Sequence, residues 1–136
     1  MKLRGVSALS IALGCTSGSA PPTFGTTPMA QLTGDAGAVH VDVYSAPDPV
    51  TRGNDEFRFV VTDAAGAAPL DGLTLDVVPW MPAMGHGTST TPIVTAEGQG
   101  KYLVTNVVIV MGGDYQLRTK ISGAVTDSVT VSFSVL

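Results

Sequence analysis

The sequence predicts an all-β fold, an antiparallel β-sandwich of about seven strands. Apolar residues recur at every second position, as at Val39, Val41 and Val43, and helical periodicity is nearly absent. Turn-forming residues separate the apolar runs at intervals of roughly ten residues. Short strands at this spacing are typical of an immunoglobulin-like sandwich, here without the disulfide of antibody domains because the chain has one cysteine.

Each expected strand has its own run of apolar side chains. The third leads directly into a methionine-rich loop, and Pro92 weakens the fourth because proline lacks a main-chain donor. The seven expected strands cover residues 39–44, 56–62, 73–77, 91–95, 101–110, 115–121 and 129–135.

The first 14 residues have the pattern of a secretion signal. A basic segment with Lys2 and Arg4 precedes an apolar run that is too short to span a bilayer. The run ends at Cys15 in a sequence that resembles a bacterial lipobox, whose cysteine becomes the acylated first residue. Ala12 stands where the lipobox usually has Leu, and cleavage after Ala20 is the competing interpretation. We expect a lipoprotein signal over residues 1–14 and lipidation of Cys15.

The rest of the chain divides into a tether and a domain. Residues 15–37 are expected to be the lipidated cysteine and a flexible segment, because Gly, Ser, Thr and Pro dominate them. Residues 38–136 are long enough for one domain with one core. Acyl chains would hold this domain on a membrane, so we expect an extracytoplasmic, membrane-anchored lipoprotein of the periplasm or outer envelope.

Charge and motifs exclude several function classes. Without residues 1–14 the chain has 11 acidic and five basic side chains, which argues against nucleic-acid binding. It lacks a Gly-x-Ser-x-Gly elbow and a phosphate-binding loop. His40 and Asp42 can pair on one strand face, but a solvated face is favoured, and Asp55-Glu56 is expected to be solvated. We therefore expect no enzyme; a hydrolase would need an acid or base in a cleft.

The segment from Trp80 to Gly87 carries the strongest chemical signal. It holds the thioethers of Met81 and Met84 and the imidazole of His86, and Met111 follows another apolar run. Thioether and imidazole donors suit Cu(I). Alternatively, the methionines fill irregular gaps in a β core. The residues alone leave both interpretations open.

Three segments together resemble the YtkA-like and FixH family. They are residues 80–87, Gly100-Lys101-Tyr102 and residues 108–115, which match a Met-Pro-x-Met-Gly-His loop, a Gly-x-Tyr strand start and a Met-x-Gly-x-Trp element. Tyr115 stands where the family often has Trp, and residues 125–136 carry no family signature. The resemblance implies a small extracytoplasmic β-sandwich module linked to copper handling and respiratory oxidase assembly.

The resemblance favours a copper site, as Cu(I), at Met81, Met84, His86 and Met111. If the loop is extended, Met84 and His86 project on one side, and we expect these two to be the main ligands. A neutral site without thiolate favours Cu(I) over Zn(II). The expected partners are a membrane, through the lipid anchor, and a copper-donor or copper-acceptor protein. The alternative is a metal-free interaction or structural module of the cell envelope.

Overall fold

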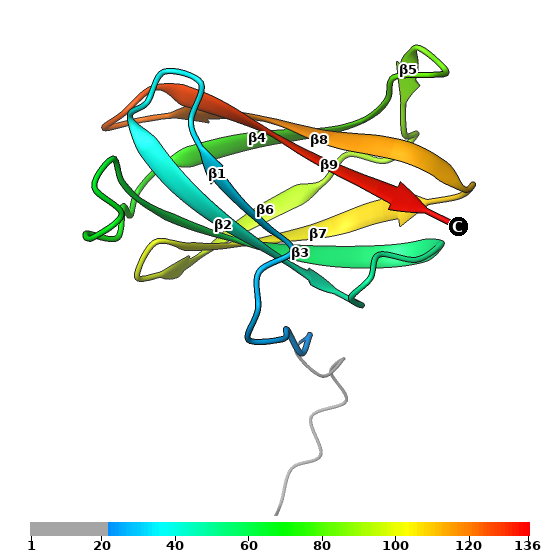
Figure 1. Cartoon of the computed structure of the whole chain (residues 1–136), viewed down its shortest axis with the longest axis horizontal. Helices are drawn as coiled ribbons and strands as arrows, with labels where there is room; N and C mark the ends of the chain where they lie inside the picture. The colour runs from blue at the N-terminus through cyan, green and yellow to red at the C-terminus, as the bar shows by residue number, and fades with distance from the viewer. Residues whose placement is uncertain (1–21) are drawn as a thin grey trace, which may run out of the picture.

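Residues 22–136, which the computed structural model describes, form two antiparallel β-sheets packed face to face (Figure 1). The five-stranded sheet has the order β1-β2-β3-β7-β6, and the four-stranded sheet has the order β5-β4-β8-β9. Within this part of the chain no helix forms, and so none could span a membrane. The predicted all-β sandwich is confirmed. The strands are β1 (Ala30–Thr33), β2 (Val39–Ala46), β3 (Gly53–Asp63), β4 (Thr74–Met81), β5 (His86–Gly87), β6 (Ile93–Gly98), β7 (Lys101–Ile109), β8 (Gly113–Ser122) and β9 (Asp127–Val135).

All seven expected strands form, and two short strands add to them. β1 lies inside the segment predicted as tether and pairs with β2 from Ala30 opposite Val43 to Thr33 opposite His40. The folded part therefore begins at or before Ala30 and not at the predicted residue 38. β5 has only two residues. Segments this short show too little alternation for a sequence pattern to reveal them.

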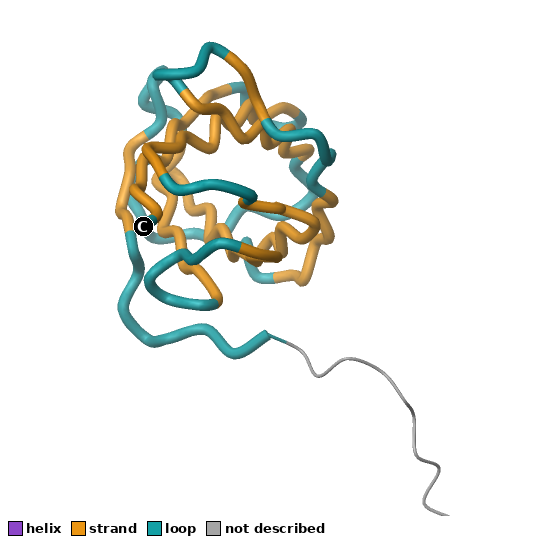
Figure 2. Tube along the Cα trace, turned by 90° about the vertical axis from the view of Figure 1, so that its right-hand side faces the viewer, coloured by secondary structure: helices purple, strands orange, loops and turns teal. Residues whose placement is uncertain are grey.

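The core lies between the two sheets, whose strands Figure 2 traces, and consists mainly of alternate side chains of β2, β3, β4, β7, β8 and β9. Val39, Val41 and Val43 are fully buried, as the period of two predicts. Burying each such side chain contributes about 1.5–3 kcal/mol. The ring of Tyr115 stacks on Phe133 at a centroid distance of 5.8 Å, which fixes the core near the start of β8.

One expectation about a charged residue was wrong. Asp55 was predicted to be solvated, but it is fully buried, because it lies two residues before Phe57 on β3 and faces the core with it. Burial raises the pKa of Asp55, and a hydrogen bond from the Thr51 main-chain N–H at 3.3 Å offsets this only in part.

The antiparallel order collects several loops at one end of the sandwich. Gly53 pairs with Ile109, and Gly113 pairs with Val135, so the β2–β3 and β7–β8 loops and the end of β9 lie together. The β4–β5 turn lies at this end too (Figure 1). We call the end that carries residues 82–85 and 110–112 the Met end.

Candidate metal centre

A tight turn connects β4 to β5 at the Met end. The main-chain N–H groups of Met84 and Gly85 both donate to the Met81 carbonyl, at 3.1 and 3.0 Å. Gly85 has a φ of 67°, which glycine adopts without strain. This turn places Met81 directly opposite His86 in the β4–β5 ladder. Opposed residues on antiparallel strands project to the same face, so these two side chains are neighbours.

Met81, His86 and Met111 line one small pocket of about 210 Å³. Met81 is 6% exposed and belongs to the core, whereas Met111 is 40% exposed and lies just after β7. The donors in the lining are two thioethers, one imidazole, main-chain groups and the hydroxyls of Thr88, Ser89 and Tyr115; no carboxylate lines the pocket. This set of side chains fits a soft monovalent ion better than a hard divalent one.

Met84 does not join this pocket. Its side chain is 54% exposed, and it lies in the turn between Met81 and His86. The expectation that Met84 and His86 project together required an extended loop, and the observed loop is a tight turn. The structure therefore groups Met81 and Met111 with His86 and leaves Met84 apart.

The imidazole of His86 is oriented by its neighbour. Its Nδ1 lies 2.9 Å from the Gly87 carbonyl oxygen. A carbonyl oxygen can only accept, so Nδ1 carries the proton in this contact, and in the neutral imidazole the lone pair is then on Nε2. A ring nitrogen fixed in this way is the usual arrangement of a metal-binding histidine.

Two polar clusters lie outside this pocket, one at His40 and one at Asp127, and both are less suited to metal binding or catalysis. His40 Nε2 lies 3.3 Å from Asp42 Oδ1 on the outer face of β2, so the pair that the sequence allows does form. Among residues 22–136, no group of three His, Cys, Asp or Glu side chains could hold a metal ion. Cys15, the predicted lipidation site, lies outside the described residues.

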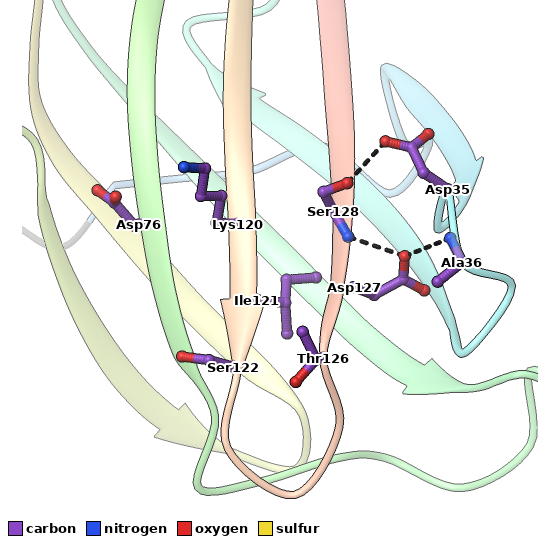
Figure 3. A pocket seen from close by; sticks show the side chains of 9 residues that line it. All are labelled: Asp35, Ala36, Asp76, Lys120, Ile121, Ser122, Thr126, Asp127 and Ser128. Carbon is purple, nitrogen blue, oxygen red and sulfur yellow. Dashed lines mark hydrogen bonds between the residues drawn. The ribbon is translucent and has the colours of Figure 1, made fainter.

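A depression of about 720 Å³ lies at the end opposite the Met end, beside the β8–β9 turn (Figure 3). Its buried acid, Asp127, accepts hydrogen bonds from the main-chain N–H groups of Ala36 at 2.7 Å, Ala38 at 2.8 Å, Val39 at 3.2 Å and Ser128 at 2.8 Å. Burial raises the pKa of Asp127, but the four donors outweigh burial and hold the pKa below its ordinary value. The carboxylate thus holds the β1–β2 turn in place through these hydrogen bonds, which is a structural role.

Tyr115 is a pocket residue with a polar role that its sequence pattern did not reveal. The family pattern marked it only as an aromatic position, but its hydroxyl donates to the Met111 carbonyl at 2.7 Å. The signal available in the sequence was its position four residues after Met111, across two glycines.

The fold and the pocket define a small β-sandwich domain with a cluster of soft donors at one end. A family model described as YtkA-like matches residues 35–120, which is more than half of the chain. The chain therefore belongs to the YtkA-like family. No curated protein and no solved structure matches it.

Proposed function

We propose that this domain is an extracytoplasmic, lipid-anchored module that binds copper as Cu(I) and acts in copper handling or transfer. The observation that carries the proposal is the meeting of Met81, His86 and Met111 in one pocket. These residues come from β4, β5 and the β7–β8 loop, and Met111 is far from the other two in sequence.

The chemistry of the pocket supports Cu(I) as the ion. Two thioethers and one neutral imidazole form a three-donor set without charge, which soft monovalent ions accept and Zn²⁺ or Mg²⁺ do not favour. When bound, the ion would be held by Met81 and Met111 through sulfur and by His86 through nitrogen. Such a site stores or transfers an ion and has no group to activate water.

Family and sequence features support the cellular setting. The FixH-like part of the resemblance points to respiratory oxidase assembly as the process that would receive copper. The lipobox-like sequence before Cys15 would place the domain on the outer side of a membrane, where a copper-donor or copper-acceptor protein could reach the Met end.

One observation favours a second candidate function. Met84, Val110 and Met111 are exposed by 54%, 70% and 40%, and all three lie at the Met end. Exposed apolar side chains grouped in this way also suit a protein contact. A metal-free interaction or structural module of the envelope is therefore the alternative.

A competitive Cu(I) titration tests the proposal. The protein is the full-length chain with Cys15→Ser, so that the single thiol cannot take the ion. A colorimetric Cu(I) chelator competes without oxygen, and the variants are His86→Ala, Met81→Leu and Met111→Leu. Met84→Leu is the matched control, since Met→Leu largely conserves side-chain volume.

We expect one ion per chain, with affinity lost in His86→Ala, reduced in Met81→Leu and Met111→Leu, and unchanged in Met84→Leu. Binding no better than that of a variant with all three pocket residues replaced would refute the copper proposal and favour the interaction module. Loss of binding in Met84→Leu alone would instead show that the ion sits on the turn and not in the pocket.

The anchor has its own test. Cells that make the chain with its own signal should incorporate a labelled fatty acid into the protein, and Cys15→Ser should abolish the label. Label that persists in Cys15→Ser, or a mature protein that begins after Ala20, would contradict the lipid anchor while leaving the copper site untouched.

A further inference from the structure

We propose that Tyr115 is a positioning residue that holds Met111 ready to bind the ion. The inference rests on the proposed function, because it assigns Met111 as a ligand. It goes beyond it by naming a residue that controls the site without touching the metal.

The side chain of Tyr115 is itself firmly held. It is 1% exposed, and its ring lies at 9° to the ring of Phe133. Phe133 in turn packs against Phe57 of the other sheet, with ring centroids 5.7 Å apart. The tyrosine hydroxyl is therefore fixed relative to the core. Because Tyr115 also lines the pocket, it connects the core to the pocket wall.

Met111, in contrast, lies where the strand ladders do not hold it. β7 ends at Ile109 and β8 begins at Gly113, so Met111 is in the connecting loop. Gly112 and Gly113 follow it, and Val110 before it is 70% exposed. The hydrogen bond from the Tyr115 hydroxyl to the Met111 carbonyl, at 2.7 Å, ties this loop to the rigid core.

This tie matters for binding because a loop ligand must be ordered when it takes the ion. Where the loop is already ordered, less conformational entropy is lost on binding, and the affinity is higher. Residues that orient a ligand from outside the first coordination shell typically change metal affinity by about 10–100-fold. Removing the hydroxyl should lower the Cu(I) affinity by about tenfold, at the low end of that range, because the tie acts through the main chain.

The chain offers a matched control at the other end of the sandwich. Tyr102 is also 1% exposed, and its hydroxyl donates to the Leu70 carbonyl at 2.8 Å and accepts from the Leu73 N–H at 3.1 Å. Tyr102→Phe therefore removes a buried hydroxyl of the same kind, but far from the pocket.

The experiment compares Tyr115→Phe with Tyr102→Phe in the full-length Cys15→Ser chain. Both variants should unfold at a lower temperature than their parent, but only Tyr115→Phe should bind Cu(I) about tenfold more weakly. A second measurement follows the ε-methyl NMR signal of Met111 without metal. It should shift and report a more mobile methyl group in Tyr115→Phe and stay unchanged in Tyr102→Phe.

Equal Cu(I) affinity of Tyr115→Phe and its parent would overturn the inference. An equal loss in both variants would overturn it too, because the effect would then be general destabilisation. If the parent binds no Cu(I), the proposed function fails first. The metal-free NMR measurement then still shows whether Tyr115 orders the Met111 loop, so the two failures are distinguishable.

Discussion

Met81 and His86 are register partners at the end of the β4–β5 ladder, with residues 82–85 as the turn between them. Cross-strand partners have Cβ atoms about 4.5–5.5 Å apart, so this pairing brings a thioether and an imidazole to one face. The turn determines which methionine has this position: Met81 is in the strand, and Met84 is on the exposed turn.

The turn between Met81 and His86 should depend on Gly85. Its φ is 67°, and no atom would meet an added Cβ within 4 Å, so Gly85→Ala introduces backbone strain without a clash. We expect the free energy of unfolding to fall by about 1 kcal/mol, measured by urea denaturation. Gly25→Ala is the control, because Gly25 also has open space but no positive φ. Equal effects of the two substitutions would argue against the turn geometry.

The three methionines of the Met end should differ in their reactivity to peroxide. Met84 and Met111 are 54% and 40% exposed and Met81 is 6% exposed, so Met81 should oxidise most slowly. Ag(I), a soft ion that peroxide does not oxidise, should protect Met111 and leave Met84 as reactive as before. Peptide mass spectrometry gives the rates. Equal protection of Met84 would place the ion outside the pocket.

Replacing Asp127 with Ala should loosen the fastening of the β1–β2 turn. Four main-chain N–H groups would lose a charged acceptor, and we expect a loss of about 2 kcal/mol in unfolding free energy at neutral pH. Asp76→Ala, at an exposed acid of the same depression, should change it by at most about 0.5 kcal/mol.

The effect of Asp127 should also depend on pH. The folded state lowers the pKa of Asp127 from 3.8, so its stabilising contribution is complete above that value. The contribution is lost as the pH falls through the lowered pKa of the folded state. Denaturation at a series of acidic pH values should show the parent and Asp127→Ala converging, and a constant difference would contradict the assignment.

The contribution of Asp55 to folding stability should have the opposite pH dependence. Burial raises its folded-state pKa above 3.8, so ionising it costs stability as the pH rises above that value. Asn has nearly the same shape and does not titrate. Asp55→Asn should therefore gain stability relative to its parent as the pH rises from about 4 to 7. Parallel pH profiles of stability for the two proteins would show that burial does not raise the pKa of Asp55.

Much of the fold follows from local pattern. The valines of β2 alternate with polar residues, so their burial needs no knowledge of the rest of the chain. Asp55 was mispredicted because its neighbours suggested a turn, whereas it lies within β3, opposite Val107 of β7, and faces the core with Phe57. β1 was missed because its four residues become a strand only by pairing with β2.

The candidate site divides in the same way. The sandwich, the donor types and the loop that carries them can be predicted from the amino-acid sequence, because alternation, turn residues and side-chain chemistry are local properties. That Met81 and Met111, and not Met84, share a pocket with His86 is seen only in the folded structure. The physical reason is that strand register and sheet packing set the distance between side chains from different strands, and neither is encoded at any single position.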